Sequence, residues 1–190
     1  MFPFSVPLIL DPRIGSAGLG IAHQIRDAMV ESDGISEKEA SERFWLIDRH
    51  GLITKALANK GLRKGLDDFV RHDSEWETAS SETAKDIMLV DVVKVVKPTV
   101  LIGTSTHGGA FTKEVVEEMS AHVERPIIFP LSNPSRLVEV HPKDANEWSR
   151  DKALLATGSP FQPVRMTNGK LYEFVPSQLI WSFVSDPPFI

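Results

Sequence analysis

The sequence contains no cysteine among its 190 residues. This absence excludes disulfide frameworks, zinc–thiolate sites and cysteine nucleophiles. Long hydrophobic runs are also missing, because no apolar stretch approaches the ~20 residues that a membrane span requires. The apolar first ten residues lack a positive flank and are interrupted by Pro3 and Pro7, so they do not resemble a signal peptide. We therefore expect a cytoplasmic or mitochondrial protein that is neither secreted nor bound to a membrane.

An excess of positive charge is lacking as well. The chain has 21 Lys and Arg against 26 Asp and Glu, a net charge of -5. Nucleic-acid binding depends on clustered basic residues, so we expect no nucleic-acid partner. The six histidines have no metal-ligand spacing, which predicts no metal site in this chain. Neither a G-x-S-x-G elbow nor a P-loop is present, which argues against a serine hydrolase and a P-loop NTPase.

Short apolar runs alternate with helical patterns along the chain. The runs predict strands at 8–10, 44–47, 99–102, 126–131 and 153–156, and the 3.6-residue periodicity predicts helices at 18–30, 86–97 and 111–122. Such alternation implies a parallel sheet covered by helices on both faces. We predict an α/β fold of the Rossmann type, a doubly wound parallel sheet in a single domain. The polar stretch 67–85 is expected to be a surface loop.

A glycine-rich turn lies between the first predicted strand and the first predicted helix. Its backbone could approach a pyrophosphate closely, and the helix N-terminus would offer free N–H groups to it. In the G-x-G-x-x-G fingerprint, Gly15 and Gly18 occupy the second and third glycine positions, but Arg13 stands at the first. The candidate phosphate-binding residues are Gly15, Ser16, Ala17 and Gly18. A glycine-rich turn without a ligand is the alternative.

Asp48 closes the second predicted strand. A carboxylate at this position of a Rossmann fold accepts hydrogen bonds from the adenosine ribose hydroxyls and repels a 2′-phosphate, which favours NAD over NADP. Asp48 lies further from Gly18 than the roughly 20 residues usual for the fingerprint, and the segment 31–40 accounts for the extra length. The adjacent Arg49 could soften the discrimination against NADP. The alternative is an aspartate that only caps a turn.

Three more loops follow predicted strands, at 103–109, 131–134 and 157–161. Ligands of open α/β sheets bind beyond the carboxyl ends of the strands, where these loops would lie together. The small residues of the first loop would admit a flat ring or a ribose. Asn133 could offer its amide to a ribose or substrate hydroxyl. Each loop alone is an ordinary polar turn, and their joint placement on one edge is what favours a site.

Five strings in this order resemble the NAD-binding domain of malic enzymes. They are GSAGLGIA (15–22), FWLIDRHGLIT (44–54), KPTVLIGTSTHGGAFT (97–112), ERPIIFPLSNPS (124–135) and ALLATGSPFQPV (153–164). The resemblance implies that the turn at 15–18 meets the pyrophosphate and that Asp48 meets the adenosine ribose. It further implies that Gly103, Thr104 and Ser105 line the nicotinamide side, with Ser132 and Asn133 near the nicotinamide ribose and malate. The LIDRHGL form resembles the NAD-preferring branch.

The ends of the chain depart from this family. We expect an altered segment at 1–13, a Rossmann domain at 14–174 and a divergent tail at 175–190, as in a truncated or mis-assembled reading frame. The family's substrate domain, with its Tyr and Lys acid/base pair and its acidic ligands for Mg or Mn, has no counterpart here. The resemblance therefore implies no catalytic residue and no metal ligand in this chain. Malate would be a partner only if a substrate domain were supplied.

Three hypotheses about function follow. The first is the NAD-binding domain of a malic enzyme, which oxidises and decarboxylates malate to pyruvate, with the isolated chain inactive. The second is a non-catalytic Rossmann-fold binding or interaction module that has lost cofactor affinity. The third is a different dehydrogenase domain that acts with a separate catalytic chain. Family members form dimers or tetramers, so a homo-oligomer is compatible with the resemblance.

Overall fold

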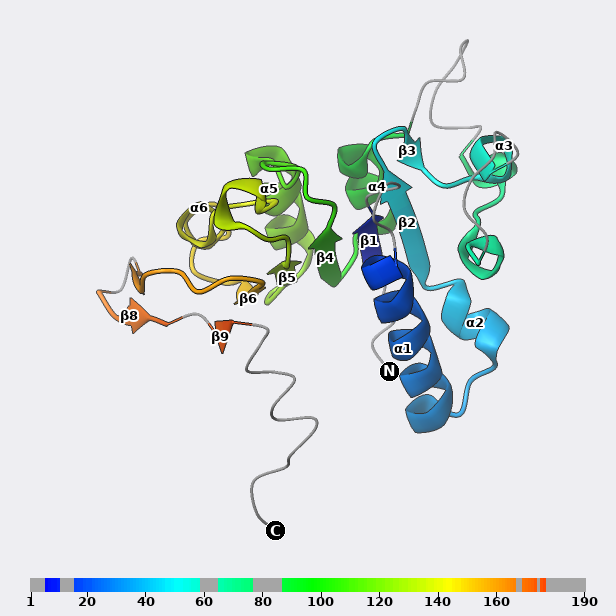
Figure 1. The fold of residues 1–190 in the computed structure, drawn as a ribbon, viewed down its shortest axis with the longest axis horizontal. Helices are drawn as coiled ribbons and strands as arrows, with labels where there is room; N and C mark the ends of the chain where they lie inside the picture. Colours follow the sequence, from blue (N-terminus) through cyan, green and yellow to red (C-terminus); the bar gives the residue numbers. More distant parts are fainter. Residues whose placement is uncertain are drawn as a thin grey trace.

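A seven-stranded sheet forms the centre of the protein (Figure 1). The computed structural model describes residues 6–10, 16–58, 65–76, 87–166, 169–173 and 175–176. Within them the strand order is β3-β2-β1-β4-β5-β6-β9, parallel throughout except that β3 runs antiparallel to β2. The strands are β1 Val6–Leu10, β2 Phe44–Asp48, β3 Gly51–Leu52, β4 Val100–Thr104, β5 Ile127–Pro130, β6 Leu154–Thr157 and β9 Val175–Pro176. A separate hairpin joins β7 Val164–Arg165 to β8 Leu171–Tyr172.

The helices alternate with the strands along the chain. They are α1 Ser16–Asp33, α2 Glu37–Ser41, α3 Lys55–Ala58, α4 Leu89–Val96, α5 Lys113–His122 and α6 Pro142–Trp148, with 3-10 turns η1 Asp67–Phe69, η2 Asp73–Glu75 and η3 Ser135–Leu137. Local sequence explains several of their ends. At the start of α5 the Thr112 hydroxyl accepts from the Val115 N–H at 3.4 Å, which caps the helix. After α4, Lys97 adopts a left-handed φ of 53° and Pro98 ends the helix.

The sheet separates two hydrophobic cores. Neighbouring side chains on a strand point to opposite faces, so Leu101 of β4 lies in one core and Ile102 in the other. The first core packs α4, α5 and α6 on the sheet, with Val93, Val116 and Ala145 fully buried. The second packs α1, α2 and η1 on the other face. The predicted doubly wound α/β sheet of a single domain is therefore confirmed.

The predicted elements agree with the observed ones to within a few residues, with three differences. In α4 the helix begins at Leu89, three residues later than predicted, and its buried side chains are Leu89, Val92 and Val93. Part of the expected surface loop at 67–85 is buried, because Phe69 is 1% exposed and Trp76 is 6% exposed. The third difference is that α3, α6, β3 and β7–β9 were not predicted, since each is only two to seven residues long. Residues 177–190 lie outside the described residues.

Candidate functional site

The strand order reverses between β1 and β4, at the middle of the sheet. From β1 the chain passes through α1 to β2 on one side, whereas β4, β5 and β6 follow on the other side. Ile9 of β1 pairs with Ile47 of β2 and with Gly103 of β4, so the residues that follow these two, Asp48 and Thr104, end the two strands that flank β1. Open α/β sheets bind ligands beyond the carboxyl ends of the strands at such a reversal. The candidate site is this edge.

Asp48 lies at the carboxyl end of β2 and is only 5% exposed. Its Oδ1 accepts the His50 N–H at 2.6 Å, which closes the two-residue turn between β2 and β3. Its Oδ2 is buried and has no hydrogen-bond partner among the described residues. Arg49, which is exposed, donates from Nε to the His50 ring at 2.9 Å. Asp48 therefore presents one acceptor with no assigned donor at the end of the strand.

The turn that carries Asp48 is held from outside the sheet. Gly51 has a φ of 106°, a conformation that glycine adopts without strain. A Cβ at this position would lie 2.6 Å from the Ile87 carbonyl oxygen, and that same carbonyl accepts the Leu52 N–H at 2.7 Å. The segment before α4 is thus hydrogen-bonded to β3 next to the β2–β3 turn. This contact holds the turn, and with it the Asp48 carboxylate, in position.

The predicted phosphate-binding turn falls partly outside the described residues. Gly15 and Arg13 are among those not described. Ser16 and Ala17 form the first residues of α1, and Gly18 in the same first turn is buried. The N-terminus of α1 therefore begins where the fingerprint predicts, beyond the carboxyl end of β1. Its first backbone N–H groups have no partners within the helix.

Gly103 and Thr104 end β4, Ser105 directly follows it, and Ser132 is the second residue after β5. The two serines are 6% and 4% exposed, and both hydroxyls donate to Glu139. Glu139 is completely buried. Sequence reasoning missed Glu139, although an acidic residue between Val138 and Val140 could have signalled a buried carboxylate. The structure thus brings the two predicted loops together around a residue that was not predicted.

The loop after β6 joins the same assembly. The Ser159 hydroxyl donates to Oδ1 of Asn133, which is exposed and precedes a cis peptide bond to Pro134. A Cβ on Gly158 would lie 2.0 Å from the Leu131 carbonyl oxygen, so only glycine fits between these loops. Three loops therefore meet at the carboxyl edge, as their predicted positions after neighbouring strands required.

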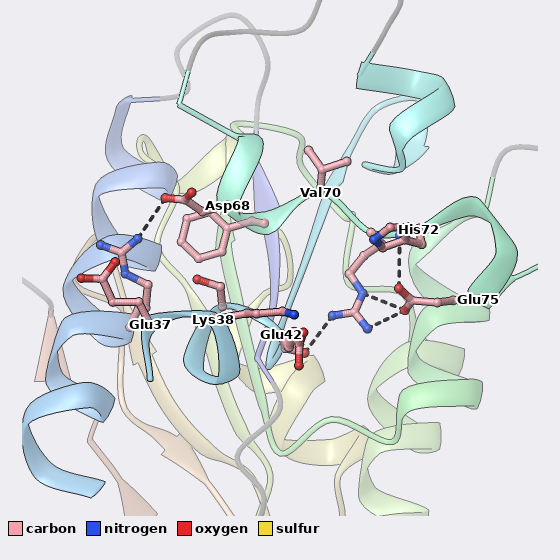
Figure 2. Close-up of a pocket in the computed structure, with 11 residues that line it drawn as sticks. Glu37, Lys38, Glu42, Asp68, Val70, His72 and Glu75 are labelled. Atoms are coloured by element: carbon pink, nitrogen blue, oxygen red, sulfur yellow. Dashed lines mark hydrogen bonds and ion pairs between the residues drawn. The ribbon is translucent and has the colours of Figure 1, made fainter. Parts of the chain in front are cut away.

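A pocket of about 610 Å³ lies elsewhere, between α1, α2 and the segment 68–75 (Figure 2). Arg71 donates to the Glu42 carbonyl at 2.8 Å, just before β2 begins, so this pocket is at the amino end of β2. Its two arginines have internal partners: Arg26 pairs with Asp68 at 3.1 Å, and Arg71 pairs with Glu75. Hydrogen bonding to Asp27 raises the pKa of Arg26. The pocket is at the opposite edge from Asp48.

The described part of the chain contains neither a metal-binding cluster nor a membrane-spanning helix. No group of three or more His, Asp or Glu side chains there converges as a metal site would require. No helix there is long and apolar enough to cross a membrane.

Comparison with known proteins identifies relatives along most of the chain. It is 46% identical over 167 residues to the NAD-dependent malic enzyme 3 of Bacillus subtilis (strain 168), an alignment that covers 83% of this chain and 27% of that protein. It is 49% identical over 151 residues to the mitochondrial NAD-dependent malic enzyme of Saccharomyces cerevisiae, covering 79% of this chain and 21% of that protein. The chain thus spans about a quarter of the length of these relatives.

A solved structure has the same fold. The crystal structure of a protein assigned as a malic enzyme (malate oxidoreductase) superimposes with a TM-score of 0.52 at 22% identity, over 84% of this chain and 35% of that chain. The family model described as "Malic enzyme, NAD binding domain" matches residues 12–184. With that match over most of its length, the chain belongs to the malic enzyme NAD-binding domain family.

Proposed function

We propose that this chain binds NAD at the carboxyl edge of its sheet, as the dinucleotide-binding part of an NAD-dependent malic enzyme. The observation that carries this proposal is the Asp48 carboxylate. One of its oxygens is occupied by the turn, and the other is buried without a partner among the described residues. A buried acceptor of this kind favours a ligand donor, because an unsatisfied buried polar atom costs free energy. The adenosine ribose of NAD carries two such hydroxyl donors.

The remainder of the edge fits the rest of the dinucleotide. The first N–H groups of α1 have no partners within the helix, and such a helix terminus favours the negative charge of a pyrophosphate. On the other side of β1, the loops at 103–109 and 131–134 are assigned to the nicotinamide half. Thr104 and Asn133 are the polar residues that we assign to the nicotinamide ribose and the substrate, in addition to Ser105 and Ser132. Bound NAD would supply the hydride acceptor for oxidation of a 2-hydroxy acid.

The discrimination between NAD and NADP is assigned to the same turn. The Asp48 carboxylate would repel a 2′-phosphate. Arg49 is exposed beside it, and its Nε is hydrogen-bonded to the His50 ring rather than to Asp48. We therefore expect a preference for NAD over NADP, which the cationic Arg49 reduces.

We assign the conversion of malate to a whole enzyme of this family and not to this chain alone. Malate decarboxylation needs a positioned acid and base, and in this family a divalent cation such as Mg or Mn. We assign those groups to sequence outside this chain, and we expect the isolated chain not to turn over malate. Self-association and a cytoplasmic or mitochondrial location are proposed with the same assignment. A second chain that supplies the substrate domain would restore turnover under this proposal.

The deciding experiment is calorimetric titration of the purified chain with NAD and with NADP. In Asp48→Asn the amide oxygen can still accept the His50 N–H, while an NH₂ donor replaces the free acceptor. We expect this variant to bind NAD about tenfold or more weakly, since a hydrogen bond to a charged group contributes about 1.5–3 kcal/mol.

The matched control is Asp67→Asn, which makes the same charge change in η1 on an exposed residue. Asp67→Asn should bind NAD like the wild type. A well-folded wild-type chain that binds no NAD would contradict the proposal and favour a non-catalytic module.

A further inference from the structure

Glu139 is a carboxylate buried without a cation. It is 0% exposed, and none of the ion pairs within the described residues includes it. Transfer of a charged group from water into a protein interior is costly unless hydrogen bonds replace its hydration. Such a residue is retained only where it is fully satisfied, so its partners indicate what it does.

Those partners are four donors from the two loops at the carboxyl edge. Glu139 Oε1 accepts the Ser105 N–H at 2.9 Å, the Ser105 hydroxyl at 3.1 Å and the Ser132 hydroxyl. Glu139 Oε2 accepts the Ser132 N–H at 3.3 Å. Ser105 follows β4 and Ser132 follows β5, so a single side chain joins the loops after two neighbouring strands.

A second layer of hydrogen bonds fixes the direction of both hydroxyls. The Ser132 Oγ accepts the Thr106 N–H at 2.8 Å, and the Ser105 Oγ accepts the His107 N–H at 3.1 Å. Because each hydroxyl has one proton and already accepts a backbone N–H, that proton is directed to Glu139. The carboxylate therefore orients the backbone of both loops through the serines.

The backbone around Glu139 is fitted to it just as closely. A Cβ on Gly103 would lie 2.4 Å from the Glu139 Cδ, so the carboxyl group lies directly against the end of β4. The Glu139 carbonyl accepts the Phe111 N–H at 2.9 Å, and the Val138 carbonyl accepts the Gly109 N–H at 3.1 Å. The loop from β4 to α5 thus wraps around Glu139 and is held at both ends.

We infer that Glu139 is a positioning residue that sets the geometry of loops 103–109 and 131–133, and through them the half of the site that receives the nicotinamide mononucleotide part of NAD. This role rests on the function proposed above. Because Glu139 is 0% exposed, it acts through the loops and not by direct contact with the cofactor. Asp48 lies on the far side of β1, so the adenosine half of the site does not depend on Glu139.

The test uses Glu139→Gln, which keeps the shape of the side chain. An amide offers one carbonyl acceptor, and its NH₂ must face donors that the second carboxylate oxygen accepted. Amide hydrogen exchange of residues 105–107 and 132 should accelerate about tenfold or more on loss of these bonds. Glu147→Gln, the same change on an exposed residue of α6, is the matched control and should leave this exchange unchanged.

Ligand binding then separates positioning from a general loss of structure. Glu139→Gln should weaken NAD binding about tenfold while it changes AMP binding by less than about twofold, since AMP contains only the adenosine half. Asp48→Asn should weaken both ligands. Unchanged exchange in both loops, or an equal loss of NAD and AMP affinity, would overturn the inference.

Two further comparisons apply if Glu139→Gln does not fold or if the wild-type chain binds no ligand. If Glu139→Gln does not fold, Ser132→Ala removes one donor to Glu139, and exchange at Ser105, whose N–H donates to Glu139, gives the readout. If the wild-type chain binds neither NAD nor AMP, the proposed function fails. The exchange comparison still shows whether Glu139 sets the two loops.

Discussion

At the scale of single residues, replacing each of two glycines by alanine is expected to change stability in opposite directions. Gly158→Ala would place a Cβ 2.0 Å from the Leu131 backbone oxygen, and backbone cannot move aside cheaply. We expect this variant to lose about 1–3 kcal/mol of unfolding free energy, the usual range for overpacking. The measurement is urea denaturation followed by circular dichroism.

Gly20 is the matched counterpart in α1. A Cβ there would meet no atom of the described residues within 4 Å, and alanine is favoured over glycine inside a helix. Gly20→Ala should therefore raise the unfolding free energy by about 0.5–1 kcal/mol. A loss of stability in Gly20→Ala would mean that the first turns of α1 are not an ordinary helix.

Only some residues of the candidate site could be predicted from the sequence. Asp48 was accessible to prediction because it directly follows an apolar strand and needs no distant partner to be located. Glu139 was not, because its role depends on contacts with Ser105, 34 residues earlier, and with Ser132 in another loop. Sequence patterns carry local periodicity, whereas these hydrogen bonds arise only after the strands have paired.

At the scale of elements, α2 depends on a reciprocal cap. The Glu39 carboxylate accepts the Ser36 N–H at 2.9 Å, and the Ser36 hydroxyl accepts the Glu39 N–H at 3.2 Å. The Ser36 N–H and then the Ser36 hydroxyl lower the pKa of Glu39 below its usual range. A pKa lowered by folding stabilises the protein above the usual glutamate pKa of about 4.3, and this contribution disappears as pH falls through the lower folded value.

We therefore expect Ser36→Ala to lose about 1 kcal/mol at neutral pH, the typical value of an N-cap. The difference in stability between wild type and Glu39→Gln should shrink as the pH falls below the usual glutamate range and through the lower folded pKa, where Glu39 becomes protonated. Denaturation curves at pH 7, 5 and 3 would measure both effects. A difference that grows on acidification would contradict the assigned cap.

Elements differ in how far the sequence predicts them. Helix α5 was predictable because Val115, Val116 and Met119 form a stripe at helical spacing, and all three are buried. Helix α6 was not, because its seven residues PKDANEW show no apolar period. Its buried Ala145 and Asn146 are determined by packing on the sheet.

At the scale of the whole molecule, β4 connects the two cores. Leu101 is fully buried in the core beneath α4 and α5. Leu101→Ala should lose about 2–5 kcal/mol, which is a large part of the about 5–15 kcal/mol that stabilises a typical domain. Leu171→Ala, on a leucine that is 57% exposed, is the control and should change stability by less than about 0.5 kcal/mol.

Ligand binding should also be visible in the stability of the whole chain. If NAD binds only the folded state, a concentration one hundred times its Kd adds about 2.7 kcal/mol to the unfolding free energy. The melting temperature should rise with NAD concentration in the wild type. A smaller rise in Asp48→Asn at the same concentration would support the assigned ribose contact, and an equal rise would count against it.

The arrangement around Glu139 also has an evolutionary consequence. Gly103, Ser105, Ser132 and Glu139 come from three separate stretches of sequence but fit one another atom against atom. A change at any one of them leaves the buried carboxylate without a hydrogen-bond partner or creates a steric clash. A single substitution therefore gives a destabilised protein. Lineages that have replaced Glu139 are expected to have replaced its partners too, and the four positions should be inherited as a block.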